Sequence, residues 1–130
     1  MLSAAEVREK ISANDNAFEK DAQVIAKYLV NCIAAKAVDE MVEQRRRKIK
    51  REYPLEAYRP AFERIGKGHL KSRMEHDEWN TLTDRAREIA NARLRKMGYK
   101  GNGFYDDSRG DPIYGGGSGM YYVLVLELAV

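Results

Sequence analysis

Six cationic side chains within seven positions are the strongest chemical signal in this sequence. The basic run consists of Arg45, Arg46, Arg47, Lys48, Lys50 and Arg51. Cations at this density attract polyanions such as nucleic acid, because each neutralised phosphate releases condensed counterions. We predict that these six residues form a surface that contacts nucleic acid.

Two other interpretations of the basic run stay open. Cations at the C-terminal end of a helix are stabilised by the helix dipole and can simply face solvent. The same cations can also dock on an acidic protein surface. Base-specific reading is not expected, because no zinc-finger, helix-turn-helix or RNA-recognition signature accompanies the run. The predicted partner is therefore nucleic acid or an acidic protein surface.

Aromatic residues follow the basic run and alternate with further cations. Tyr53, Tyr58 and Phe62 are interleaved with Arg59 and Arg64. Aromatic side chains beside cations can stack on single-stranded bases. Their spacing fits the core-facing side of a short helix better, so we expect them to be buried.

The remaining candidates for chemistry lack the context that a reaction or a metal ion needs. His69 and His76 would lie two helical turns apart, and neither a His-Glu-x-x-His nor a Cys-x-x-Cys pattern is present. Cys32 falls on an apolar helix stripe, where a buried structural cysteine is expected. The glycines of 115–119 lack the Lys-Ser/Thr of a phosphate loop. We expect no enzyme, no metal site and no cofactor.

Length and charge describe the setting of the basic run. The 130 residues fit a single domain, with a helical part over 1–97 and a glycine-rich β-hairpin over 98–130. The segment 43–73 holds eleven Lys/Arg against four Asp/Glu, although the whole chain is only +3. No apolar run approaches the roughly 20 residues of a membrane span, and no signal-peptide pattern opens the chain. We expect a cytoplasmic protein without a membrane partner.

The helical part is predicted to position the basic run at the end of a long helix. Ser3 and Glu6 have the spacing of a capping box for a short first helix that breaks near 12–15. Apolar residues then recur at helical spacing, which predicts one helix from about 16 to 52. At 1.5 Å per residue it would span roughly 55 Å, which exceeds the roughly 30 Å diameter of a compact domain of this length. We therefore expect the basic end of this helix to project. A further helix is predicted from Thr81 to Met97, closed by Gly98.

The C-terminal part is predicted to be an antiparallel β-hairpin. Residues 120–128 alternate as a strand that is apolar on both faces, and 99–105 supply its partner. Such a strand either invites the sheet edge of another molecule, with Tyr121, Val123 and Val125 at the interface, or is covered by the chain's own helices. The expected class is α+β, mainly helical, with a long central helix.

The last third of the chain has a recurring arrangement. A helix ending in Arg93-Leu-Arg-Lys-Met-Gly-Tyr99 is followed by a glycine-rich gap and the strand Tyr121-Tyr-Val-Leu-Val-Leu-Glu-Leu128. In this arrangement the chain resembles small accessory proteins of tailed bacteriophages. The resemblance implies a non-enzymatic role, such as binding host machinery, blocking a defence complex or occupying a place in the virion. It carries over no site residue.

These observations predict a non-enzymatic, phage-type accessory protein that binds nucleic acid through a basic helix end. The alternative is a protein-interaction component, either an inhibitor of a host defence complex or a virion structural subunit. That alternative would assemble as a homo-oligomer or in a larger assembly through the C-terminal strand and the apolar stripes of the helices. The expected location is the cytoplasm of a bacterial host, or the virion.

Overall fold

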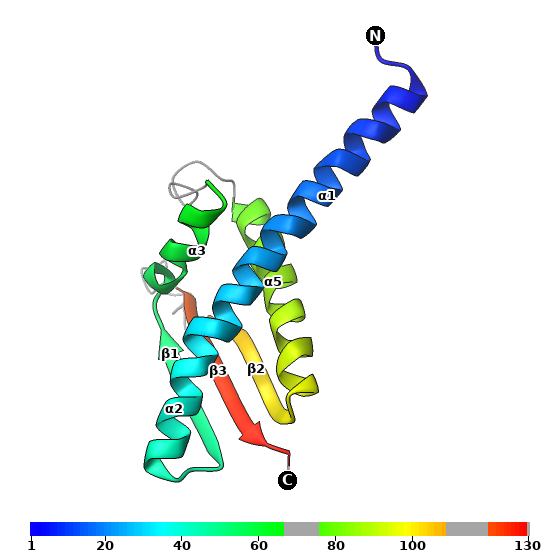
Figure 1. Cartoon of the computed structure of the whole chain (residues 1–130). Helices are drawn as coiled ribbons and strands as arrows, with labels where there is room; N and C mark the ends of the chain where they lie inside the picture. Colours follow the sequence, from blue (N-terminus) through cyan, green and yellow to red (C-terminus); the bar gives the residue numbers. More distant parts are fainter. Residues whose placement is uncertain (67–75, 109–119, 130) are drawn as a thin grey trace.

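The computed structural model describes residues 1–66, 76–108 and 120–129 and has the predicted α+β class (Figure 1). The helices are α1 (Ala4–Tyr28), the π-helical η1 (Leu29–Ala34), α2 (Ala35–Gln44), the 3-10 helix η2 (Leu55–Tyr58), α3 (Arg59–Arg64) and α5 (His76–Lys96). The strands are β1 (Lys48–Tyr53), β2 (Tyr99–Ser108) and β3 (Met120–Leu128).

The strands form a three-stranded antiparallel sheet in the order β1-β3-β2. The predicted hairpin of β2 and β3 is present, and β1 adds a strand that the sequence pattern did not indicate. Ile49 of β1 lies opposite Leu126, and Phe104 of β2 lies opposite Leu124. β3 is therefore the central strand, paired along both edges within the chain, and the expectation of an open edge on this strand is wrong.

One face of the sheet packs against the helices, and this layer contains the core (Figure 1). The alternation of β3 directs Tyr122, Leu124 and Leu126 into that layer, where all three are buried. Tyr122 stacks on Tyr53 and meets Tyr58 edge-on, with ring centroids 5.9 and 5.0 Å apart. The aromatic residues after the basic run thus pack in the core, as their spacing predicted.

Tyr58 gives the core a measurable pH dependence. Burial raises the pKa of Tyr58 to about 12, and its hydroxyl lies 3.3 Å from that of Tyr53. The unfolded chain releases this proton near pH 10, so the free energy of unfolding should fall by roughly 2 kcal/mol between pH 10 and 12. Urea denaturation across this range should show a steeper decline for the wild type than for Tyr58→Phe. Equal declines of stability with pH in the two proteins would contradict the raised pKa of Tyr58.

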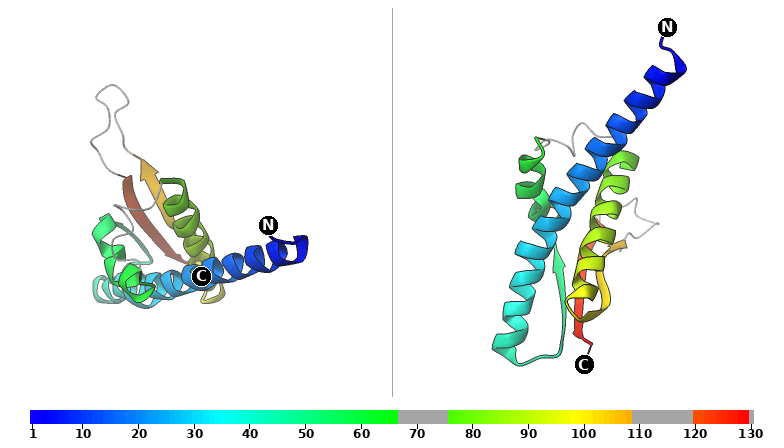
Figure 2. Two further views of the ribbon diagram at one scale, coloured as in Figure 1. Left: turned by 90° about the horizontal axis from the view of Figure 1, so that it is seen from above. Right: turned by 45° about the vertical axis from the view of Figure 1, so that its right-hand side comes forward.

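The N-terminal half of α1 projects beyond the rest of the molecule (Figure 2). The predicted cap is confirmed, because the Ser3 hydroxyl accepts a hydrogen bond from the Glu6 backbone N–H at 3.2 Å. The predicted break near 12–15 is wrong, and α1 continues without interruption. Ser, Asn and Asp cost only a few tenths of a kcal/mol each in a helix without Pro or Gly. Residues 1–17 are all exposed, and contacts with the body begin at Phe18.

The C-terminal end of the long helical stretch bends back instead of projecting. α2 ends at Gln44, and Arg45 adopts a left-handed conformation with φ 56° and ψ 42°. The Arg46 N–H then donates to the Met41 carbonyl at 2.9 Å, which closes the helix end. The chain reverses into β1, so the prediction that the basic run lies on a projecting helix is wrong.

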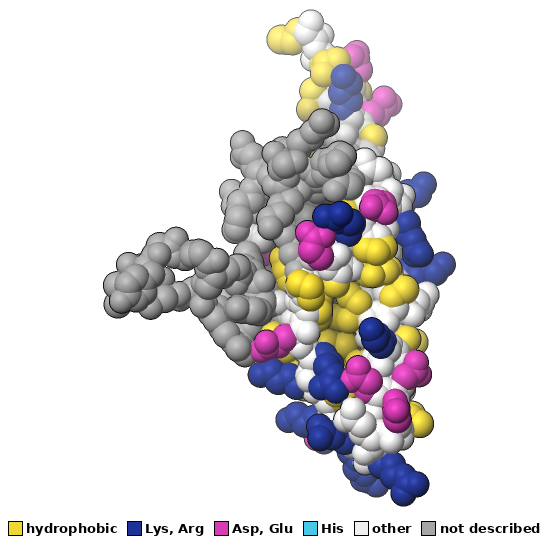
Figure 3. Space-filling model, turned by 90° about the vertical axis from the view of Figure 1, so that its left-hand side faces the viewer, with side chains coloured by type: hydrophobic (Ala, Val, Ile, Leu, Met, Phe, Trp, Pro, Cys, Tyr) yellow, Lys and Arg dark blue, Asp and Glu magenta, His cyan; other side chains and the backbone are white. Residues whose placement is uncertain are grey.

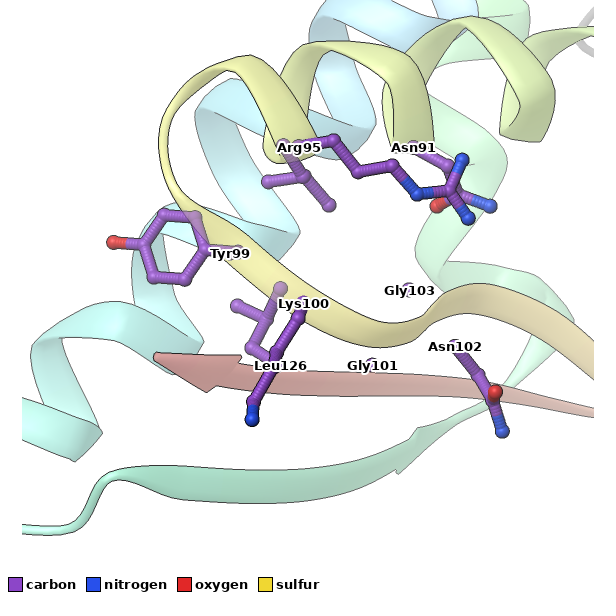
Figure 4. A pocket seen from close by; sticks show the side chains of 9 residues that line it. Asn91, Arg95, Tyr99, Lys100, Gly101, Asn102, Gly103 and Leu126 are labelled. Carbon is purple, nitrogen blue, oxygen red and sulfur yellow. The ribbon is translucent and has the colours of Figure 1, made fainter. Parts of the chain in front are cut away.

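β2 contains a bulge between Lys100 and Gly103, where the strand is attached to α5. A small pocket lies beside this bulge (Figure 4). The Asn91 side chain accepts from the Phe104 N–H at 2.8 Å and donates to the Phe104 carbonyl at 3.1 Å. Gly103 has a φ of +66°, and a Cβ there would lie 2.3 Å from the Asn91 oxygen. A glycine is therefore required at 103 for the clamp that holds β2 beside the end of α5.

Candidate nucleic-acid interface

The basic run forms a tight turn and the beginning of an edge strand. Arg45, Arg46, Arg47 and Lys48 are all exposed where α2 passes into β1. The turn is held from both sides: Arg46 is bonded back to α2, and the Arg47 carbonyl accepts from the Leu128 N–H at 2.9 Å. The four side chains are thus presented to solvent from a fixed backbone.

A second group of cations lies at the C-terminal end of α5. Arg95 and Lys96 occupy the last turn of this helix, and Lys100 follows at the start of β2. Gly98 closes the helix in the predicted left-handed conformation with φ 97°, and its carbonyl accepts from the Ala129 N–H at 3.1 Å. All three cations are exposed.

The end of β3 joins the two groups. Consecutive backbone N–H groups, those of Leu128 and Ala129, bind the turn at Arg47 and the turn at Gly98. Both groups therefore lie at the same end of the molecule, the lower end in Figure 1, and Figure 3 shows Lys and Arg side chains gathering there. We call this surface the basic end. It comprises Arg45, Arg46, Arg47, Lys48, Arg95, Lys96 and Lys100.

Strand geometry separates the last two cations of the basic run. Lys50 is exposed beside Val125, on the sheet face away from the core. Arg51 lies on the opposite face, as do its buried neighbours Ile49 and Tyr53. There its guanidinium is paired with the carboxylate of Glu40 on α2 and donates to the Lys50 carbonyl at 3.0 Å. Lys50 thus lies next to the basic end, on the outer face of the sheet, whereas Arg51 fastens β1 to α2.

A pocket of about 300 Å³ opens at the basic end. α2 contributes Val38, Met41 and Val42, and the end of the sheet contributes Tyr99 and Leu128. The three arginines of the turn complete the lining. An apolar floor thus lies next to exposed cations, and Val42 keeps 74% of its surface exposed.

The residues predicted for a protein interface lie in the central strand. Val123 is fully buried and Val125 is 7% exposed. Tyr121 pairs with Asp107 through the backbone, and its side chain lies outside the described residues. The described members of this set therefore do not form an exposed surface.

The other candidate residues do not assemble into a site. Cys32 is exposed on η1, so the prediction of a buried cysteine is wrong; the π-helical turn rotates it away from the core stripe. Within 1–66, 76–108 and 120–129, no group of three His, Cys, Asp or Glu could hold a metal ion. His69 and 115–119 lie outside the described residues.

No protein-family model matches the sequence, and neither the curated proteins nor the solved structures contain a significant match. In the described part of the chain, no helix has the length and apolar character to cross a membrane.

Proposed function

We propose that this protein binds nucleic acid through the basic end, as a non-enzymatic accessory protein. The observation that supports the proposal is the convergence of two basic turns, 45–48 and 95–100, that are about 50 residues apart in the sequence. A convergent group of exposed cations creates the local positive potential that concentrates a polyanion. Two acidic residues lie close to these cations in the sequence or in space. Glu43 precedes Arg45 by two residues, and the Glu127 carboxylate oxygen Oε1 lies 3.6 Å from the Lys100 Nζ.

The backbone geometry indicates how nucleic acid would be bound. Because the run 45–51 is a turn and a strand, it offers no basic helix for insertion into a major groove. The exposed side chains instead suit contacts with phosphates along a backbone, which carry affinity without reading sequence. The proposed binding is therefore electrostatic and tolerant of base sequence.

Purification of the untagged protein tests this proposal with the fewest assumptions. Light scattering and the 260/280 nm absorbance ratio would be followed before and after treatment with nuclease and high salt. We expect a nucleic-acid-rich species that collapses to clean protein. Protein that is free of nucleic acid at low salt, and that binds no added oligonucleotide, would refute the proposal.

A second candidate function rests on the projecting part of α1. Leu2, Val7 and Ile11 are 43%, 40% and 54% exposed. Val7 and Ile11 continue, at helical spacing, the stripe that reaches the body at Phe18. An apolar stripe of this kind on an exposed helix suits contact with another helix. Under this alternative, the chain is an interaction component, either an inhibitor of a host defence complex or a virion subunit.

Charged substitutions on the apolar stripe of α1 test this alternative. The double variant Val7→Glu, Ile11→Glu should leave the unfolding midpoint nearly unchanged, because both side chains are exposed. If two copies associate through α1, sedimentation velocity should show an oligomer for the wild type and a monomer for the variant. The matched control Ala5→Glu, Ser12→Glu adds the same charge off the stripe and should remain oligomeric. A monomeric wild type at all concentrations would exclude self-association through α1.

A further inference from the structure

We infer that the pocket at the basic end receives an unpaired nucleobase, so that the ligand is single-stranded nucleic acid. This inference rests on the proposed function and adds the class of ligand to it. It is carried by the juxtaposition of an apolar pocket with the three arginines that line its rim.

The pocket has the size and lining for a flat group with apolar faces. Its volume of about 300 Å³ lies at the lower end of the roughly 300–1,000 Å³ typical of small-molecule sites. Val42 on α2 and Leu128 at the end of β3 contribute exposed apolar surface, and Tyr99 adds an aromatic ring. A base held there can contact apolar side chains with its faces.

The rim supplies the contacts that the rest of a nucleotide needs. Arg45, Arg46 and Arg47 are exposed beside the apolar floor. A guanidinium can bind a phosphate in bidentate fashion or stack on a base. Among the described residues, the lining contains no carboxylate or side-chain amide, which leaves the Tyr99 hydroxyl as the side-chain acceptor for a base edge. With so few acceptors to match against the donors of a base, the pocket should accept different bases.

Whether a nucleobase can enter the pocket depends on whether it is base-paired. In a duplex, each base is stacked between its neighbours and its faces are covered, so removing it from the stack costs free energy. In a single strand the bases are free to enter, and base–aromatic stacking then adds to the phosphate contacts. The structure thus predicts a preference for single strands over duplexes of equal length.

The preference can be measured by fluorescence anisotropy with three labelled probes. These are a 12-nucleotide oligothymidine, a duplex of the same length and an abasic deoxyribose-phosphate strand. We expect the oligothymidine to bind about tenfold more tightly than the abasic strand, the scale of one stacked base. A glutamate-rich peptide serves as the probe for an acidic protein ligand.

Two substitutions test the pocket without changing the charge of the rim. Val42→Met extends a longer, non-aromatic side chain into the pocket from an exposed position, and Tyr99→Leu removes the aromatic face while keeping an apolar side chain. Both should lower oligothymidine affinity about tenfold and leave duplex affinity unchanged. The matched control Gln44→Met places the same side chain on an exposed residue outside the lining and should bind like the wild type.

The outcomes separate this inference from the function on which it rests. Equal affinity for all three probes, unaffected by the pocket variants, would overturn the base pocket and leave nucleic-acid binding in place. Binding of the glutamate-rich peptide alone, or of no nucleic acid at all, would overturn both.

Discussion

Replacing Arg45, Arg46 and Arg47 together by Gln is expected to weaken nucleic-acid binding about 100-fold near 0.1 M salt. All three side chains are exposed on the turn after α2. If each phosphate contact contributes about 1 kcal/mol, three of them account for a loss of this size. The turn should persist in the variant, because its hydrogen bonds at Arg46 and Arg47 come from the backbone. Anisotropy measures the loss, and circular dichroism checks that the fold is retained.

Arg51→Gln is the matched control for this variant. It removes a cation from the same run, but Arg51 is paired with Glu40 on the core-facing side of β1. We expect nearly wild-type affinity. A third variant with Gln at 95, 96 and 100 should weaken binding through the other group of cations. A loss for Arg51→Gln as large as for the triple variant, or no loss at 95–100, would contradict the assignment of the basic end.

A charge at the centre of the sheet should destroy the fold. Val123 is fully buried in the central strand, where it lies opposite Glu52 on one side and Tyr105 on the other. Neither of these two sheet neighbours carries a positive charge, so burying a carboxylate beside them costs about 4 kcal/mol or more, whether it stays charged or takes up a proton. This loss is comparable with the roughly 5–15 kcal/mol by which domains are stable. We therefore expect Val123→Asp to be unfolded or nearly so.

Val42→Asp is the control for the chemical change itself. Val42 is 74% exposed in the last turn of α2, so only an unfavourable interaction with the helix dipole is added. Its cost should stay below about 1 kcal/mol. Urea denaturation followed by circular dichroism compares the two variants. A folded Val123→Asp with wild-type stability would show that β3 is not the centre of this sheet.

The sequence predicted the helix ends and the strand that are specified by a few neighbouring residues. Ser3 and Glu6 marked the start of α1, and Gly98 marked the end of α5. The alternation of 120–128 indicated β3 and its pairing with β2. In each case, the deciding contacts are local or join strands that follow one another in the chain.

β1 could not be found in this way, because its pattern is ambiguous and its partner is distant. Ile49 and Tyr53 are four residues apart, a spacing that fits one face of a helix as well as one face of a strand. No glycine marks the turn, since Arg45 itself adopts the left-handed conformation. What makes 48–53 a strand is its pairing with 122–127, a contact between residues that are 69 to 79 positions apart in the sequence. Tertiary pairing overrides local propensity here.

The same reason explains which part of the basic end the sequence revealed. Arg45–Lys48 stand out as a run, whereas Arg95, Lys96 and Lys100 are ordinary cations at a helix end. The backbone bonds from Leu128 and Ala129 place the two groups together. The sequence contained two weak signals for the second group of cations. One is a Gly-capped helix end rich in Lys and Arg, and the other is the apolar strand that was predicted to pair with the segment after it.

The dependence of oligonucleotide affinity on salt tests the central claim most directly. For single strands, the slope of log K against log salt is about −0.7 per neutralised phosphate. If the seven cations of the basic end each neutralise one phosphate, the wild-type slope should approach −5, and the triple arginine variant should lose about 2 from its magnitude. A wild-type slope near zero, or a slope that the triple variant leaves unchanged, would contradict binding of nucleic acid through the basic end.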